Sequence, residues 1–328
     1  ALGREVGAVL AAILLAGRSG CAIPAQLGVM RVTEELDAMR VMGIAQGYRL
    51  VMPRAIAMAI AIIGRGIDLS ILSTMPVSAA WLLTLVNGGM PIGLAFVCAL
   101  GFVIAVGIIN GTLIAYVEIP AIFATLAMGI VVYGFGKAFM TPIDAVYTGR
   151  GESWFYAIGS GRVLGIPSPV IVFALVAAAA FLFLRTLKPG RFIYGMGDNP
   201  LAARVTGIPV RPMIILQYVI ISIIALIAGI VMATALAGIN TRLALSTMVY
   251  DVILVVVLGG IGLAGGKGGI RNVVVGTLLI GILLNGMTIM NLTYTVQSIL
   301  KSVILLLAIV ADTLLNPRDE QTAQHGDI

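Results

Sequence analysis

The chain has 328 residues, of which 60% are hydrophobic and 10% are charged, and its mean hydropathy is +1.11. Soluble domains are about 45–50% apolar and about 25% charged, so this composition excludes an ordinary soluble protein and predicts a surface that mostly faces lipid. The net charge of +6, from 20 basic and 14 acidic residues, does not indicate nucleic acid binding, because the basic residues lie between apolar segments as in membrane proteins.

The scarce reactive residues argue against enzymatic or metal chemistry. Cys21 and Cys98 lie far apart in apolar sequence and do not suggest a disulfide framework. The single histidine, His325, lies in a polar tail. We therefore expect no catalytic, cofactor-binding or metal site.

The first part of the chain differs from the rest. An apolar run at 6–27 is broken by Arg18, and a polar stretch follows at 28–49, where apolar residues recur at roughly helical spacing. This pattern predicts an amphipathic helix at a membrane face. The side on which it lies stays open, because 50–64 either crosses the membrane or only dips into it.

Apolar segments dominate from residue 50 onward, and a membrane helix needs about 20 mostly apolar residues. Including the weak runs 6–27 and 50–64, we predict an all-α polytopic membrane protein with about 8–10 transmembrane helices. The other segments are 90–117, 119–140, 167–184, 212–237 and 296–316, which qualify clearly, and 67–86, 244–265 and 271–290, which contain interruptions.

The loops predict the orientation. Basic residues in 185–211 far outnumber its single acid, Asp198, which predicts a cytoplasmic loop. Counting spans from there places Lys267 and the tail 317–328 on the cytoplasmic side as well, and the loop 141–166 outside.

Asp68 interrupts an apolar run within the sequence Gly-Ile-Asp-Leu-Ser at 66–70. An ionisable residue inside a membrane is a functional candidate by default, and broken helices expose backbone polar groups along transport paths. The alternative is that Asp68 caps a helix beginning at Leu69. The two roles are compatible.

Two glycine patterns resemble nucleotide-binding motifs and fail on inspection. Residues 260–265 match G-x-G-x-x-G, but membrane spans flank them and the expected downstream acid is missing. Gly266-Lys267 lacks the other residues of a phosphate-binding loop, since Ile261 and Gly268 stand at required positions. The segment therefore predicts close packing or a tight turn, and ATP-driven transport requires a nucleotide site in a partner.

The segment 195–208 predicts a short helix between glycines, with Asn199 as its N-cap and Pro200 at its first position. A capped helix that protrudes from a membrane domain suits contact with a soluble partner. The pattern alone is equally compatible with an ordinary loop helix.

From this segment outward, the sequence resembles the permease family of ribose-, xylose- and arabinose-type ABC importers over about 56–316. The matching blocks occur in the family's order. They are Ile-Asp-Leu-Ser at 67–70, Asn-Gly-Thr-Leu-Ile-Ala-Tyr at 110–116, Pro-Ala-Ile-Phe-Ala-Thr-Leu at 120–126, Gly-Arg-Phe-Ile-Tyr at 190–194, Asn-Pro-Leu-Ala-Ala-Arg at 199–204 and the Gly-rich segment 257–268.

The resemblance implies a dimeric membrane domain with a second permease copy or paralogue, ABC ATP-binding subunits on the cytoplasmic side and a periplasmic sugar-binding protein. It also implies that 195–208 is the coupling helix. The residues assigned to coupling are Gly197, Asn199, Pro200, Ala203, Arg204 and Gly207. The residues assigned to the transport pathway are Asp68, Ser70, Asn110, Thr125 and Asn285.

Residues 1–54 instead resemble the Mla-type phospholipid-transport permeases, through Arg4–Gly7, Leu15–Arg18 and Gly28–Ile44. We therefore divide the chain into an Mla-permease-like segment at 1–54, a sugar-type permease domain at 55–316 and a polar cytoplasmic tail at 317–328. A natural fusion, a gene-model join and an engineered join all remain open. Ile71-Leu72-Ser73 also replaces the Val-Gly-Ser usual in the sugar permeases.

The leading hypothesis is the permease subunit of an ABC importer for a monosaccharide or related small polar solute in a bacterial inner membrane. It is not itself an enzyme and needs no cofactor. The alternatives are a phospholipid-transport permease, which rests on 1–54, and an ion-coupled secondary transporter, against which the scarcity of acids near the spans argues.

Overall fold

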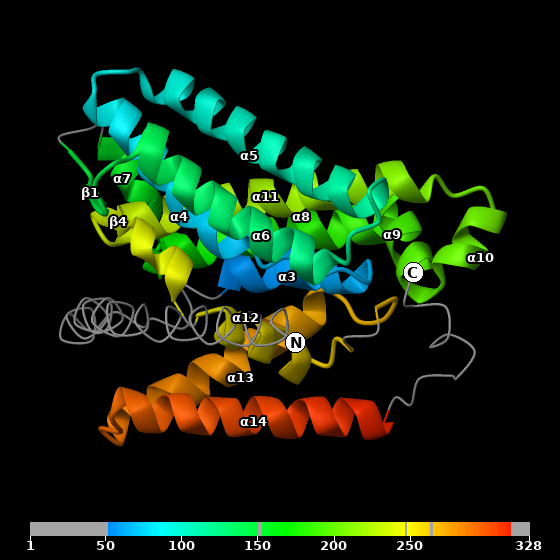
Figure 1. Cartoon of the computed structure of the whole chain (residues 1–328). Coiled ribbons are helices and arrows are strands. Elements are labelled where there is room, and N and C mark those ends of the chain that lie inside the picture. The colour runs from blue at the N-terminus through cyan, green and yellow to red at the C-terminus, as the bar shows by residue number, and fades with distance from the viewer. Residues whose placement is uncertain (1–51, 150–152, 247, 263–264, 316–328) are drawn as a thin grey trace, which may run out of the picture. The chain divides into compact units, whose positions relative to one another are not determined.

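The computed structural model describes residues 52–149, 153–246, 248–262 and 265–315 (Figure 1). The predicted amphipathic helix at 28–49, the weak span 6–27 and the tail 317–328 lie outside these residues, so those predictions stay open. The described residues all belong to one compact unit.

The described residues are mainly helical. The helices are α3 (Met52–Ile63), α4 (Ile71–Asn87), α5 (Ile92–Ala115), α6 (Ala121–Phe135) with its π-helical end η1 (Gly136–Met140), α7 (Ser153–Ser160), α8 (Ser168–Thr186), α9 (Lys188–Asp198), α10 (Pro200–Val205), α11 (Val210–Ala235), the 3-10 helix η2 (Thr241–Leu245), α12 (Met248–Leu258), α13 (Ile270–Ile289) and α14 (Tyr294–Leu315). The strands are β1 (Ala145–Tyr147), β2 (Arg162–Val163), β3 (Ile166–Pro167) and β4 (Gly238–Asn240).

Six helical segments in the described part of the chain are long and apolar enough to cross a membrane. Three shorter apolar helices, α3, α4 and α12, fall on predicted spans that are weak or interrupted. They are short because non-helical turns follow α3 and α12 and precede α4. The predicted all-α polytopic fold is confirmed. The six long segments are Ile92–Ala115, Ala121–Met140, Ser168–Thr186, Val210–Ala235, Ile270–Ile289 and Thr295–Asp312.

Helices α3 and α11 form the core of the bundle. The side chains of α3 from Ala55 to Ile63 are at most 1% exposed, and α11 packs against α3, α4, α5 and α7. Gly107 and Gly111 of α5 face the backbone of α11, where a Cβ atom would collide with Val219 and Ile215. Small residues at this position allow the two helices to approach closely.

The outer helices present apolar side chains outward. Large hydrophobic residues of α5, α6, α13 and α14 are exposed, among them Phe123, Ile130, Ile282 and Leu306. Exposed apolar faces of this extent are unusual for a soluble monomer and fit contact with lipid.

The loops gather at two ends of the bundle (Figure 1). At one end β1 pairs antiparallel with β4, and the Asn87 side chain hydrogen-bonds the backbone of Tyr147 and Gly149. At the other end lie α9, α10 and the turn after α5, where Arg211 pairs with Glu118 at 3.2 Å. This alternation agrees with the loop order that the sequence predicts. Which end is cytoplasmic remains a prediction.

Candidate functional site

The chain breaks its helical path between α3 and α4, inside the bundle. Residues 64–70 form no regular helix, and Arg65 turns the backbone with a φ of 63°. The last carbonyls of α3 still accept from the backbone, since the amides of Gly64 and Gly66 donate to Ile60 and Ala61 at 3.3 and 2.8 Å, and a side chain adds to these bonds. Gln217 of α11 donates from Nε2 to the carbonyls of Ile60 and Ala61, at 3.2 and 3.0 Å. Irregular backbone at membrane depth is tolerated only where such groups are satisfied within the protein.

Four polar side chains surround this break, and we call them the polar cluster: Asp68, Ser70, Asn110 and Thr125. They come from the break itself, α5 and α6, and none is more than 1% exposed. Asn110 donates from Nδ2 to Ser70 Oγ at 2.9 Å. The Thr125 hydroxyl accepts from the amide of Leu69 at 3.1 Å, and its one proton has two acceptors within reach, the carbonyl of Ala121 at 2.8 Å and that of Ile67 at 3.1 Å. Four of the five residues predicted for the pathway are thus brought together.

Asp68 organises the start of α4. Its Oδ1 accepts from the amide of Ser70 at 2.9 Å and from the Ser70 hydroxyl at 2.6 Å. This is the geometry of a side chain that closes a turn onto its own backbone and so begins a helix. The helix starts at Ile71 rather than at Leu69, and its N-cap is Ser70, which has no side-chain capping hydrogen bond. Asp68 therefore closes the turn before the helix and is not its N-cap.

The cluster keeps hydrogen-bonding capacity that it does not use. Asp68 Oδ2, Asn110 Oδ1 and the hydroxyl of Tyr218 are buried and have no hydrogen-bond partner among the described residues. A Cβ atom on Gly66 would lie 2.6 Å from that hydroxyl, so Tyr218 closes over the break. Groups of this kind are rare in folded proteins and call for an explanation.

The fifth predicted pathway residue, Asn285, does not join the cluster. It is exposed on α13, and no hydrogen bond in the described structure links it to the other four. Tyr218 was not predicted, because its position within the apolar α11 depends on packing. The one sequence signal for it was its position beside Gln217, since two adjacent polar residues stand out in the apolar segment 212–237.

Helix α10 has the caps that the sequence predicts. Asn199 Oδ1 accepts from the amides of Leu201 and Ala202, both at 3.0 Å, and Pro200 occupies the first helical position. Gly207 follows the helix with a φ of +83°, a conformation that favours glycine.

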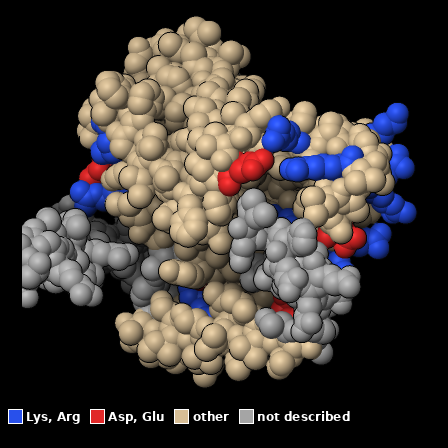
Figure 2. Space-filling view, turned by 45° about the vertical axis from the view of Figure 1, so that its right-hand side comes forward, with Lys and Arg blue, Asp and Glu red and all other residues tan. Residues whose placement is uncertain are grey.

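The outer face of α10 is exposed and mixed in character. Ala203 is buried beneath the helix, whereas Leu201, Arg204 and Val205 are exposed, Val205 by 89%. Lys and Arg side chains gather at this end of the molecule, while its body shows few charges (Figure 2). The helix therefore offers a rigid, partly apolar and positively charged surface.

The Gly-rich turn packs beneath this surface. The amide of Gly266 donates to the carbonyl of Ile63, the last residue of α3, at 2.9 Å. Gly197 also lies against this carbonyl and leaves no room for a Cβ atom. The hydroxyl of Tyr194 in α9 donates to the carbonyl of Gly268 at 2.9 Å. The predicted tight turn is present, and the helix α12 precedes it where a dinucleotide fold needs a strand.

A broken helix in a polytopic bundle and a capped helix at one end define the class, a membrane transport protein. Residues 39–310 match the protein family described as "Branched-chain amino acid transport system / permease component". The chain belongs to this permease family.

Individual relatives narrow the class. The ribose import permease protein RbsC of Escherichia coli (strain K12) is 33% identical over 262 residues, which are 79% of this chain and 80% of the relative. RbsC of Haemophilus influenzae is 30% identical over 266 residues, 80% of this chain and 82% of the relative. The galactofuranose transporter permease protein YtfT of Escherichia coli (strain K12) is 30% identical over 259 residues, 79% and 75% of the two chains. No solved structure matches. The resemblance to sugar-type importer permeases is confirmed.

Proposed function

We propose that this chain is the membrane-spanning permease subunit of an importer for a monosaccharide or a related small polar solute. A partner ATPase drives it from the cytoplasmic side of a bacterial inner membrane. A periplasmic sugar-binding protein delivers the solute, and a second permease copy or paralogue completes the pathway. The relatives support a sugar rather than a phospholipid, since they include import permeases for ribose, galactofuranose and fructose.

The geometry of α10 carries the coupling part of this proposal. A helix that is capped at Asn199 and anchored through Ala203 cannot easily reorient on its own. Its exposed Leu201, Arg204 and Val205 combine the apolar area and the cation that a docking surface needs. Contact with an ATPase at this helix would move α9 and the Gly-rich turn together with it.

The polar cluster supports a role in the pathway. A sugar offers hydroxyl groups that both donate and accept, which suits Asp68 Oδ2, Asn110 Oδ1 and the Tyr218 hydroxyl. Asn110 lies five residues before the end of α5, about 8 Å from that end at about 1.5 Å per residue. This position near the α10 end of α5 supports a role for the cluster as a gate at that end of the bundle.

The test is a reconstituted complex with the cognate ATPase and binding protein, screened against a panel of sugars. Arg204→Glu should abolish sugar-stimulated ATP hydrolysis, because it reverses the charge at the docking surface. Arg162→Glu makes the same charge change at β2, at the opposite end of the bundle, and should leave the binding of the ATPase intact. Unchanged stimulation in the Arg204 variant would reject the assignment of α10.

Membrane orientation is tested separately. A cysteine introduced at Val205 should react with a membrane-impermeant thiol reagent only after the cytoplasmic side is opened. Reaction from the outer side of intact cells would overturn both the orientation and the ATPase docking site.

A further inference from the structure

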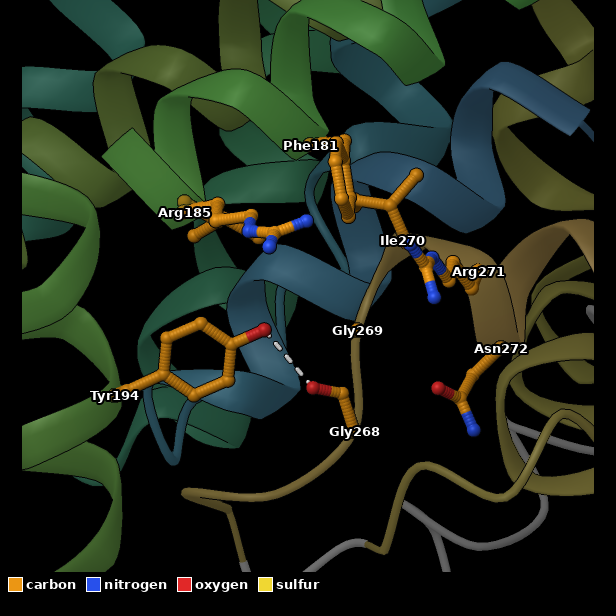
Figure 3. Close-up of a pocket in the computed structure, with 9 residues that line it drawn as sticks. Phe181, Arg185, Tyr194, Gly268, Gly269, Ile270, Arg271 and Asn272 are labelled. Atoms are coloured by element: carbon orange, nitrogen blue, oxygen red, sulfur yellow. Dashed lines mark hydrogen bonds between the residues drawn. The ribbon is translucent and has the colours of Figure 1, made fainter. Parts of the chain in front are cut away.

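A pocket of about 460 Å³ lies where the end of α8 and the start of α13 meet α9 and the Gly-rich turn (Figure 3). Two arginines reach into it, Arg185 from α8 and Arg271 from the first turn of α13. Both lie over the ring of Phe181, with their guanidinium carbons 5.6 and 5.3 Å from its centre. One aromatic ring thus holds two cations beside the same space.

These cations are not neutralised within the described structure. The ion pairs among the described residues use Lys137, Arg211, Arg242 and Lys301, and none involves Arg185 or Arg271. The helix α13 adds its positive end, because its N-cap is Gly269, which has no capping side chain, and its first turn has no acid. Two guanidinium groups beside a helix N-terminus form a strong site for an oxyanion, above all a phosphate group.

The surfaces that lead away from the pocket are apolar. On α8, the exposed residues Leu175 and Leu182 are seven residues apart, and Leu182 precedes Arg185 by three, so the three share one face. On α13, Val275, Leu278 and Ile282 continue the face on which Arg271 lies, and all are exposed. Each arginine therefore stands at the end of an apolar stripe on a membrane-spanning helix.

We propose that this pocket binds the phosphate headgroup of an anionic phospholipid whose acyl chains lie along α8 and α13. Free phosphate would satisfy the arginines but would leave the two apolar stripes without a partner. Basic pockets between membrane helices at the cytoplasmic face bind anionic headgroups in this way. The site is separate from the polar cluster and from the exposed face of α10.

The experiment is native mass spectrometry of the purified permease titrated with phosphatidylglycerol and, in parallel, with phosphatidylcholine. The wild type should bind phosphatidylglycerol preferentially. The double variant Arg185→Gln/Arg271→Gln should bind phosphatidylglycerol at least about tenfold more weakly, because it removes the charged hydrogen-bond donors that hold the phosphate. Its binding of phosphatidylcholine should stay unchanged.

The matched control is Arg162→Gln/Arg191→Gln, which removes two exposed charges outside the pocket and should retain the wild-type preference. If the glutamine pair fails to fold, Arg185→Lys/Arg271→Lys keeps both charges and should keep a preference for phosphatidylglycerol. Equal loss in the pocket and control variants would overturn the proposal. Full displacement of the lipid by inorganic phosphate would also overturn it. So would a pocket variant that binds lipid like the wild type but no longer binds the ATPase, because the pocket would then be a contact for that protein.

Discussion

At the scale of single residues, the two carboxylate oxygens of Asp68 have different roles: one stabilises the fold, and the other remains available for function. Its Oδ1 holds the first turn of α4 through Ser70, whereas its Oδ2 has no partner among the described residues. The sequence made Asp68 a candidate for two roles because it is an acid in an apolar run. Only the packing of α5 and α6 could show that Asn110 hydrogen-bonds Ser70 and that Thr125 hydrogen-bonds the backbone on both sides of Asp68.

We predict that Asp68→Ala lowers the free energy of unfolding by about 1–3 kcal/mol, because it leaves buried donors of Ser70 unsatisfied. Asp68→Asn should cost less, since its amide oxygen can still accept from Ser70. Thermal unfolding of the detergent-solubilised permease, followed by tryptophan fluorescence, measures both. Equal losses for the two variants would show that the accepted hydrogen bonds are not what Asp68 contributes.

Arg54 is the opposite case, a buried cation with poor partners. Its side chain is 1% exposed, and its hydrogen bonds go to the sulfurs of Met75, Met232 and Met248 at 2.8, 3.2 and 3.1 Å. A thioether is a weak acceptor. The nearby carboxylate of Asp251 already forms an ion pair with Lys301 at 2.6 Å.

We expect Arg54→Met to raise the unfolding free energy by about 1–4 kcal/mol, as an apolar side chain of similar volume removes the desolvation penalty of the charge. The exposed Arg162 provides the control, and Arg162→Met should change stability by less than about 0.5 kcal/mol. A lower melting temperature for Arg54→Met would mean that the cation is needed where it lies.

At the scale of elements, features that depend on neighbouring residues in the sequence were predicted well, whereas features that depend on contacts with other helices were not. The caps of α10 follow from Asn199, Pro200 and Gly207 within one short segment, so the sequence was sufficient to predict them. The short lengths of α3 and α12 were harder to predict, because the turns after them are held by side chains of other helices, Gln217 of α11 and Asn272 of α13. Periodicity carries no information about such partners.

Two glycines with the same backbone conformation allow a test of α10. Gly207 and Gly89 have φ values of +83° and +90°, and a Cβ atom would meet nothing within 4 Å at either position. Alanine at each should therefore cost about 1–2 kcal/mol from the left-handed conformation alone.

Only Gly207→Ala should also reduce sugar-stimulated ATP hydrolysis, because Gly207 ends the helix proposed to dock on the ATPase, whereas Gly89 lies at the far end of the bundle. Melting temperatures and coupled hydrolysis, measured on the same preparations, separate the two effects. A similar loss of coupling in Gly89→Ala would assign the effect to general destabilisation.

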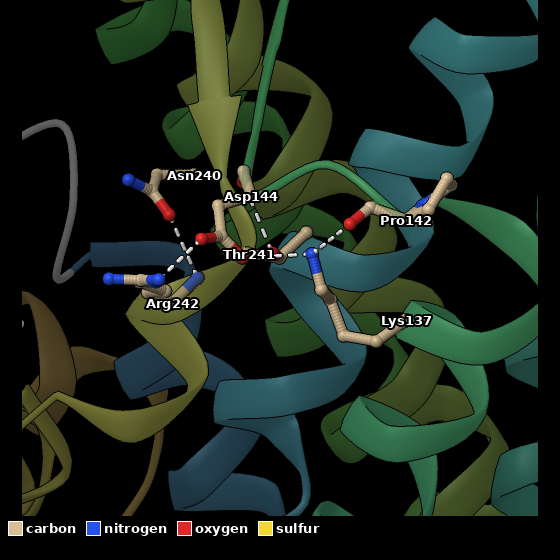
Figure 4. Close-up of polar contacts among 6 residues, drawn as sticks. All are labelled: Lys137, Pro142, Asp144, Asn240, Thr241 and Arg242. Atoms are coloured by element: carbon tan, nitrogen blue, oxygen red, sulfur yellow. Dashed lines mark hydrogen bonds and ion pairs between the residues drawn. The ribbon is translucent and has the colours of Figure 1, made fainter. Parts of the chain in front are cut away.

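At the scale of the whole molecule, the end opposite α10 is held by ion pairs of Asp144, one with a neighbour in the sequence and one with a distant residue. Asp144 pairs with Lys137 at 2.8 Å and with Arg242 at 2.6 Å, and its backbone carbonyl accepts from Thr241 (Figure 4). The hydrogen bond from Lys137 is the main cause that lowers the pKa of Asp144, with Arg242 adding to it. The alternation of loops was predictable from apolar segments, but this pairing and the β1–β4 ladder required the fold.

Because the pKa of Asp144 is lower in the folded state, its ionisation contributes stability that is complete above the unfolded pKa of about 3.9. The contribution is lost as the pH falls below that value and through the folded pKa. We predict that Asp144→Asn lowers the melting temperature at pH 7 and that the difference from wild type shrinks toward pH 3. A difference that stays constant over this range would exclude the ion pairs as its source.

The contact between Gly266 and Ile63 has a mechanical consequence. The carbonyl of Ile63 is the last of α3, it is fixed by the Gly-rich turn beneath α9, and the chain turns from there toward Asp68. A movement of α9 and α10 would thus be transmitted to the polar cluster through two residues in the left-handed conformation, Arg65 and Gly266, with φ values of 63° and 69°. We expect a transition between inward-open and closed forms to rotate these few bonds and to leave the long helices as rigid rods, which distances between spin labels on α4 and α10 would register.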